Sequence, residues 1–164
     1  MATQLNSFDI VSKVNMQELD NALNQARKEI DNRFDFKGTG SRIEGGKDNL
    51  VIFSSDEFHL KAMIDVIETR LVRREVPLEA MDWRPITDGP KGTVKREARV
   101  LEGIDSDKAR EITKFVKKLD KKANVAVQQD QVRVSSKSKD ALQEVLKAVR
   151  EHDFAIPLQF TNYR

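Results

Sequence analysis

The sequence feature that most constrains the fold of this chain is a duplicated pattern. The segment VPLEAMDW (76–83) aligns residue for residue with IPLQFTNY (156–163), and VIFSS (51–55) likewise matches VRVSS (132–136). Before each closing segment, short apolar alternations and longer helical periods follow one another in the same order. A chain of 164 residues is long enough for two small domains. The pattern therefore predicts the element order βαββαβ twice.

In the first repeat, the segment FDIVSKV is typical of a strand with Phe8, Ile10 and Val14 on one face. A helical period follows, and residues 41–55 then predict a hairpin. We expect Ser54 to be the N-cap of the second helix, because a serine side chain can accept a hydrogen bond from a free amide of the first turn.

The second repeat has the same order. Residues 93–101 predict a strand, Asp105 opens a helix, and residues 124–136 predict a tight hairpin. A further helix precedes the last strand at 156–163. The prolines and glycines of residues 85–92 are typical of a linker between the repeats.

Together these elements predict an α+β fold class of two tandem ferredoxin-like (βαββαβ) domains. We place the first domain at residues 1–88 and the second at 89–164. Each antiparallel sheet would carry its helices on one face and leave the other face free. Alternation within the strands predicts that this free face is polar and partly basic.

Several longer segments resemble the bacterial YajQ family: FDIVSKVN, QELDNALNQARKEIDNRFDFKG, GIDSDKAREI and PLQFTNYR. The resemblance covers nearly the whole chain. It implies two ferredoxin-like domains whose first strands, residues 7–14 and 93–101, are exchanged between them. It also implies nucleotide binding, with cyclic di-GMP and RNA as ligand types, and a regulatory rather than a catalytic role.

The two repeats differ by an insertion. Aligning Leu23 with Ile112 sets the repeats 89 residues apart, whereas aligning Val76 with Ile156 sets them 80 apart. The first repeat therefore carries about nine extra residues between its first helix and its hairpin, in the stretch RFDFKGTGSRIEGG. Because duplicated domains need the same core, an insertion in one of them is a better functional candidate than the shared parts.

The chemistry of the inserted stretch suits a phosphate. Its arginines and lysine are charge-assisted donors, its glycines allow close approach of the backbone to an anion, and a phenylalanine could stack on a base. The predicted nucleotide-binding residues are Arg33, Asp35, Phe36, Lys37, Gly38 and Arg42. In the alternative interpretation, the two phenylalanines anchor the loop in the core and Asp35 pairs with a neighbouring arginine.

A second candidate surface is the most basic helical stretch, which could bind a nucleic-acid backbone without reading its sequence. Its predicted nucleic-acid-binding residues are Lys114, Lys117, Lys118, Lys121 and, from a neighbouring strand, Arg133. The alternative is an ordinary solvated helix face. Recognition by aromatic side chains on central strands has little support, because Phe53 is the one candidate there.

Other classes of function are disfavoured by composition. The chain has no cysteine and only two isolated histidines, so we expect neither a metal site nor a cofactor. No catalytic motif occurs, and SRIEGGKD lacks the first glycine and the hydroxyl of a P-loop, so we expect no enzyme. Neither a signal peptide nor a membrane-spanning run is present, which favours a cytoplasmic location.

The partner that we expect is a nucleotide (cyclic di-GMP, GTP or ATP) or RNA, with a protein partner also open. The net charge of +2 is too small to indicate nucleic-acid binding by itself. The alternative function is a protein-interaction adaptor that uses its open sheet faces and has no nucleotide ligand.

Overall fold

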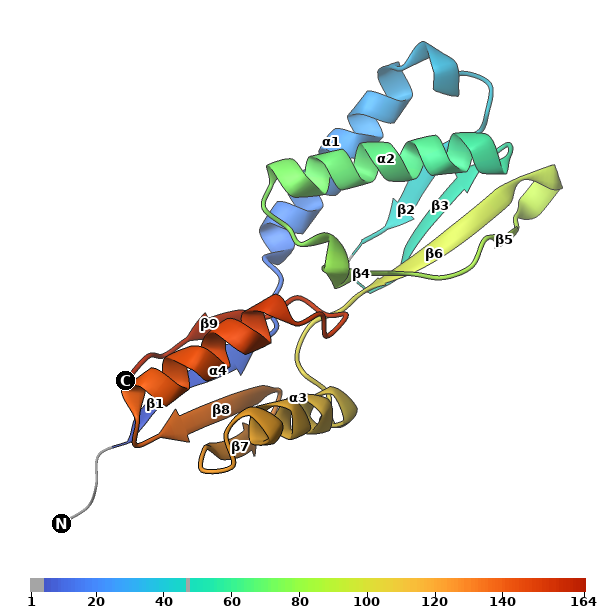
Figure 1. The fold of residues 1–164 in the computed structure, drawn as a ribbon. Helices are drawn as coiled ribbons and strands as arrows, with labels where there is room; N and C mark the ends of the chain where they lie inside the picture. The colour runs from blue at the N-terminus through green and yellow to red at the C-terminus, as the bar shows by residue number, and fades with distance from the viewer. Residues whose placement is uncertain (1–4, 47) are drawn as a thin grey trace. The chain divides into compact units, whose positions relative to one another are not determined.

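The computed structural model describes residues 5–46 and 48–164, which form two compact units. Unit 1 contains residues 5–13 and 102–164, and unit 2 contains the residues between them. Four α-helices and two antiparallel sheets make up the described part of the chain, so the fold class is α+β (Figure 1).

Unit 2 holds a sheet in the order β2-β3-β6-β4, with the short β5 also paired to β6. Helices α1 and α2 pack against each other and cover one face of this sheet (Figure 1). The elements are α1 (Met16–Asn32), β2 (Arg42–Gly45), β3 (Leu50–Ser54), α2 (Glu57–Arg73), β4 (Met81–Trp83), β5 (Thr87–Asp88) and β6 (Val94–Val100). Three short 3₁₀ helices lie at Phe34–Phe36, Leu78–Ala80 and Pro90–Gly92.

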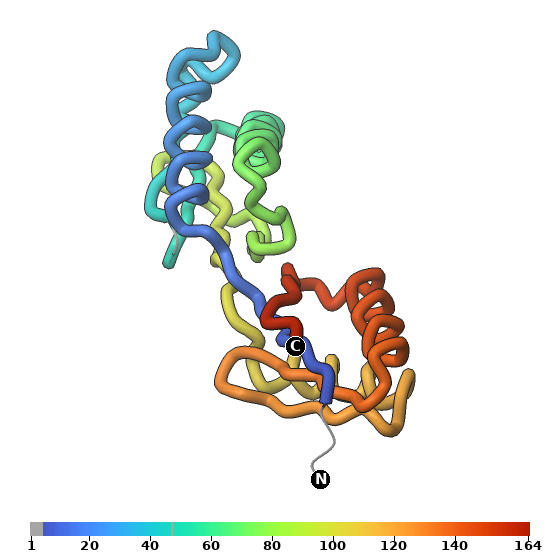
Figure 2. The backbone as a smooth tube through the Cα atoms, turned by 90° about the vertical axis from the view of Figure 1, so that its left-hand side faces the viewer, coloured from blue at the N-terminus to red at the C-terminus, as the bar shows by residue number. Residues whose placement is uncertain are grey.

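Unit 1 holds a sheet in the order β7-β8-β1-β9. Its elements are β1 (Asn6–Val11), α3 (Ser106–Leu119), β7 (Asn124–Gln128), β8 (Gln131–Ser136), α4 (Lys139–Glu151) and β9 (Gln159–Thr161). The N-terminal strand, blue in Figure 2, therefore lies beside the dark red C-terminal segment. Conversely, β6 comes from the second half of the sequence and lies between β3 and β4 of the first half.

Each unit has its own apolar core between the sheet and the helices. In unit 2, Leu19, Leu23 and Ile30 of α1 are buried against strand residues such as Ile52, because residues three and four apart share one helix face. Burial of each such side chain contributes about 1.5–3 kcal/mol to the free energy of folding. The core of unit 1 is a separate cluster around Phe8, Ile10, Ile112, Val134 and Val149.

The expectation for the first strand is wrong in one residue. Phe8 and Ile10 do face one core, but β1 ends at Val11 and Val14 is buried in the core of unit 2. Only two residues, Ser12 and Lys13, thus lie between the end of β1 and the first residue in the core of unit 2. Periodicity alone does not reveal this change, because Val14 continues the apolar alternation of the strand.

The prediction that Ser54 caps the second helix is also wrong. The N-cap of α2 is Asp56, whose carboxylate accepts the amide hydrogen of His59 at 2.8 Å. Ser54 is instead fully buried at the end of β3. Its counterpart in unit 1 is Ser136, which is buried at the end of β8 and precedes the N-cap, Ser138, by the same two residues. The sequence match of VIFSS with VRVSS pairs Ser54 with Ser135, whereas in the structure Ser54 corresponds to Ser136. The two alignments differ by one residue, which matters because successive side chains of a strand point to opposite faces.

Candidate functional site

The inserted stretch forms a loop between α1 and β2, and its two phenylalanines have opposite environments. Phe36 is 4% exposed and belongs to the core of unit 2, whereas Phe34 is 84% exposed. Both lie in a 3₁₀ helix of three residues, which turns side chains two apart to different sides. Only Phe36 therefore anchors the loop in the core. The ring of Phe34 is exposed and is available to stack on a base.

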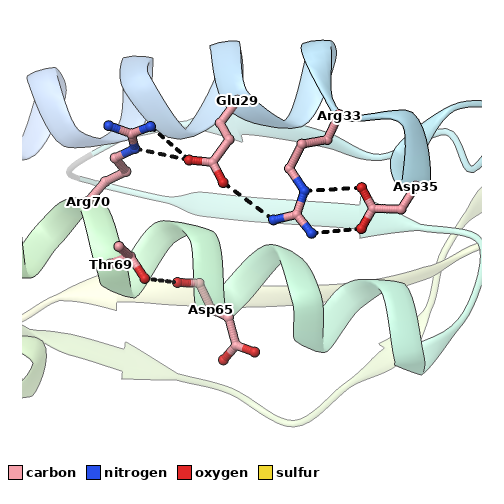
Figure 3. Close-up of polar contacts among 6 residues, drawn as sticks. All are labelled: Glu29, Arg33, Asp35, Asp65, Thr69 and Arg70. Carbon is pink, nitrogen blue, oxygen red and sulfur yellow. Dashed lines mark hydrogen bonds and ion pairs between the residues drawn. The ribbon is translucent and has the colours of Figure 1, made fainter.

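An ion-pair network holds the start of this loop against both helices (Figure 3). Arg33 donates to Asp35 through two nitrogens, at 3.0 and 2.7 Å, and to Glu29 at 3.3 Å. From α2, Arg70 donates to the other oxygen of Glu29 at 2.8 Å. The pairing of Asp35 with a neighbouring arginine is thus present in the structure. The bidentate geometry matches the planar fork of the guanidinium group.

The pKa values in the network follow from these contacts. The hydrogen bond from Arg70 lowers the pKa of Glu29, with a further contribution from Arg33. The hydrogen bond from Arg33 likewise lowers the pKa of Asp35, and Asp35 raises the pKa of Arg33. Both carboxylates are therefore ionised at neutral pH, and the charge of Arg33 is balanced within the protein.

The tip of the loop, in contrast, presents uncompensated donors. Lys37 is exposed, and among the described residues no carboxylate lies within ion-pair distance of it; its Nζ lies 5.6 Å from the ring centroid of Phe34. Gly38 and Gly40 have φ values of 74° and 65°, which glycine adopts without strain. In the described part of the chain, the backbone amides of these two glycines have no acceptor. The space beside both glycines is open.

Hydroxyl groups fix the far side of the loop. Thr39 donates to the carbonyl of Phe36 at 2.6 Å and lies 2.6 Å from the hydroxyl of Ser41. Ser41 in turn lies 2.8 Å from the buried hydroxyl of Ser54 in β3. The tip is therefore held at both ends, by ion pairs before it and by a hydroxyl chain after it.

Arg42 lies beyond the loop, in β2. Its guanidinium group pairs with Glu44 at 2.8 Å and covers the ring of Phe53 at 4.0 Å from the centroid. Because Arg42 and Phe53 are directly opposite across two strands, they share the sheet face that the helices leave uncovered. The structure thus places Arg33, Asp35, Lys37 and Gly38 together and gives Arg42 a partner on the sheet.

Two residues near the loop were not singled out from the sequence. Phe58, in the first turn of α2, is 78% exposed, and its ring lies 5.4 Å from that of His59. His59 also contacts the ring of Phe36 at 6.5 Å, and its Nδ1 lies 2.7 Å from Asp56. Two adjacent aromatic residues at the start of a helix give no periodic pattern in the sequence. Their position near the loop is therefore seen only in the three-dimensional structure.

The lysines of the predicted basic surface lie on α3 and just after it. Lys114 and Lys118 lie exposed on α3, but Lys121 follows the end of that helix at Leu119, which corrects its expected place on the helix face. Lys117 is exposed too, and its ammonium group donates to the carbonyl of Ala123. All four lysines are exposed, and their role in nucleic-acid binding stays a prediction.

Arg133 is not a free cation. It donates to both oxygens of Asp9, at 2.8 and 3.2 Å, and Asn162 donates to Asp9 at 2.8 Å. The hydrogen bond from Arg133 lowers the pKa of the buried Asp9 even though burial alone would raise it. The uncovered face of the unit 1 sheet is therefore crossed by a neutralised ion pair.

Residues 5–46 and 48–164 contain neither a metal-binding cluster nor a membrane-spanning helix. No group of three histidine, aspartate or glutamate side chains there could hold a metal ion. No helix in the same residues has the length and hydropathy needed to cross a membrane.

The fold and the loop define a class of protein: an α+β chain with two helix-covered antiparallel sheets, one of which carries an exposed glycine-rich loop with a lysine at its tip. The family model described as "Nucleotide-binding protein YajQ-like" matches residues 6–164. The chain belongs to this family, as the resemblance of its segments indicates.

Relatives named "nucleotide-binding protein" match the chain over nearly its full length. One from Koribacter versatilis (strain Ellin345) is 46% identical over 159 residues, which covers 97% of this chain and 97% of that protein. Another from Desulfitobacterium hafniense (strain DSM 10664 / DCB-2) is 46% identical over 158 residues, covering 96% and 97%. A third from Bacillus cereus (strain Q1) is 47% identical, with the same coverage.

Proposed function

We propose that this protein binds a nucleotide through the tip of the inserted loop, and that it acts as a non-catalytic regulatory protein. The observation that carries the proposal is the group of free donors at the tip. Lys37 and the amides of Gly38 and Gly40 lack acceptors among the described residues, beside a phenylalanine ring, Phe34, that is exposed. The names of the relatives support the same ligand class.

The charges of the loop favour a phosphodiester over a triphosphate. Arg33 and Arg42 are balanced by carboxylates at 2.7 and 2.8 Å, so one lysine carries the uncompensated charge at the tip. A phosphodiester has one negative charge and acceptor oxygens for both amides, whereas a triphosphate is bound with Mg²⁺ and a richer set of cations. We therefore propose cyclic di-GMP as the first ligand to test, ahead of GTP or ATP.

The network of Figure 3 would serve this function by fixing the loop before a ligand arrives. Arg33 and Asp35 would act as positioning residues, and Phe36 as the anchor in the core. Preorganisation of this kind improves affinity because less conformational freedom is lost on binding. Phe34 would stack on the base, which is worth about 1–3 kcal/mol in comparable contacts.

The finer description of the fold is part of the same proposal. We propose that each unit is a ferredoxin-like sandwich, with domains that follow the repeats at 1–88 and 89–164 except for exchanged first strands. The sheet orders β4-β6-β3-β2 and β9-β1-β8-β7 support this, since β6 and β1 then take the same central place in the two sheets. We also propose a cytoplasmic location.

The test is a calorimetric titration of the full chain with cyclic di-GMP, with GTP and a short single-stranded RNA as competitors. Lys37→Gln should weaken binding about tenfold, or about 1.4 kcal/mol, and Phe34→Ala should weaken it by a similar factor. Lys28→Gln is the matched control, because Lys28 is also exposed, on α1, and lies outside the loop. Equal losses in all three variants, or no binding of any nucleotide, would refute the proposal.

RNA is a second candidate ligand, supported by the exposed Lys114, Lys118 and Lys121, which have no carboxylate partner among the described residues. An RNA binder that neutralises phosphates with lysines loses affinity steeply as salt rises. Salt-sensitive RNA binding without dinucleotide binding would move the function to α3. Absence of both would favour the protein-interaction adaptor.

A further inference from the structure

The duplication puts an open cavity in unit 1 at the position that the inserted loop fills in unit 2. The position is defined by Ser54 in unit 2 and by Ser136 in unit 1, each buried at the end of its strand. In unit 2, the loop covers this serine, with Ser41 at 2.8 Å from it. Unit 1 has no insertion, and Ser136 lines a cavity of about 570 Å³.

The charge on the wall of the cavity is positive. Lys122 and Lys137 both line it, and neither has a carboxylate partner among the described residues. The one acidic residue in the lining is Asp120, whose carboxylate accepts the amide hydrogen of Lys122 at 3.0 Å. Two lysines against one carboxylate favour an anion in the cavity.

Neutral donors are available on the same wall. Ser136 is 5% exposed, and its hydroxyl accepts the amide hydrogen of Ser138 at 3.2 Å. Its own hydroxyl hydrogen has no acceptor within the part of the chain that the structure describes, and a buried donor without an acceptor is unfavourable. Asn124, also in the lining, has a side-chain amide with no partner of its own there. A ligand oxygen would satisfy both groups.

We propose that this cavity binds the phosphate or diphosphate group of a small molecule. Two lysine point charges match the charge of a phosphate monoester, and its several acceptor oxygens can meet Ser136 and Asn124 at the same time. Ala141 gives the cavity an apolar part of its wall, against which the rest of the molecule would lie. This site is separate from the loop of unit 2 and does not depend on the function proposed for it.

The experiment titrates the full chain with pyrophosphate and records amide chemical shifts by NMR, together with the heat of binding. We expect shifts concentrated around Asn124 and Ser136, and an affinity that falls at least fivefold in Lys122→Gln and in Lys137→Gln. Lys147→Gln is the matched control, because Lys147 is exposed on α4 of the same unit and does not line the cavity. This control should bind pyrophosphate as the unchanged protein does.

A second pair of measurements separates a binding role from a structural one. Ser136→Ala removes only the hydroxyl and should weaken pyrophosphate binding while a urea titration shows that the unit remains folded. In Lys37→Gln, a change in the loop of unit 2, pyrophosphate should still shift the amides around Asn124 and Ser136 as in the unchanged protein. Failure of the loop proposal would therefore not refute this one. If ADP binds more tightly than pyrophosphate, the ligand is a nucleotide. If ADP and pyrophosphate bind with equal affinity, the ligand is a simpler phosphorylated molecule.

Two results would overturn the proposal. One is the absence of shifts around Asn124 and Ser136 at millimolar pyrophosphate. The other is an equal loss of affinity in Lys122→Gln, Lys137→Gln and Lys147→Gln, since that result would indicate diffuse attraction to a basic surface.

Discussion

Replacing each phenylalanine of the loop by alanine tests whether the loop is anchored by one ring and leaves the other free. Phe36 is 4% exposed, and removing a buried phenylalanine costs about 3–5 kcal/mol. Its ring also meets His59 edge-on at 6.5 Å and lies 4.9 Å from the guanidinium carbon of Arg33. Because a loop can detach from the core without unfolding the whole unit, we expect a cost near the lower end, about 3 kcal/mol.

Phe34→Ala should change the free energy of unfolding by less than about 0.5 kcal/mol, because Phe34 is 84% exposed. The two variants remove the same side chain two positions apart, so the comparison isolates burial. Phe36→Leu is a third variant that keeps most of the apolar volume, and its cost should be about 1 kcal/mol.

The assay is urea denaturation followed by tryptophan fluorescence. The chain has one tryptophan, Trp83, which packs against the core of unit 2, so the signal reports on the unit that carries the loop. With a slope of roughly 1.5 kcal/mol per molar urea, a loss of about 3 kcal/mol lowers the midpoint by about 2 M. Equal midpoints for Phe34→Ala and Phe36→Ala would show that the assignment of the buried ring is wrong.

Three further changes test other contacts. Arg70→Met should destabilise unit 2 by about 1 kcal/mol at neutral pH. Because Arg70 lowers the pKa of Glu29, this loss of stability, measured by urea titration, should become smaller as the pH falls below about 4.3. Asp9→Asn should lower the urea midpoint of unit 1 at pH 7, because Arg133 holds the pKa of Asp9 below its ordinary value. The loss should begin to shrink as the pH falls below about 3.9 and should vanish only below the lowered pKa of the folded state; an unchanged loss at low pH would contradict the ion pair. Gly45→Ala should lower the thermal midpoint markedly, because the φ of Gly45 is 80° and an added Cβ would lie 1.9 Å from the backbone oxygen of Asn49. A midpoint within one degree of that of the unchanged protein would contradict this backbone geometry.

Much of the local structure could be predicted from the sequence. Alternation in FDIVSKV indicates that Phe8 and Ile10 share a face, and both are buried in one core. The helical period that follows this segment corresponds to α1, and Asp105 caps α3 where the sequence predicts. These predictions succeed because they depend on residues a few positions apart, whose geometry is determined by the helix or strand itself.

For the candidate site, the sequence could indicate the loop but not the state of its charges. Arg33 and Asp35 are two residues apart, so their pairing was open to inference from the sequence. The bond from Arg70 to Glu29 joins residues 41 positions apart and depends on how α1 and α2 pack. Likewise, nothing in the order Phe-Asp-Phe shows which ring is buried, because both fit a short turn equally well.

By itself, the sequence determined the types and order of most elements and the place of the loop, since these follow from local periodicity and from comparison of one half with the other. The duplication stays a prediction. Only the tertiary structure decided that β1 pairs with β8 and β9, and that β6 pairs with β3 and β4. It also decided which cations are balanced and that unit 1 keeps a cavity where unit 2 has its loop. The physical reason is that a strand has the same alternation in whichever sheet it lies, so its partners are chosen by the packing of distant side chains.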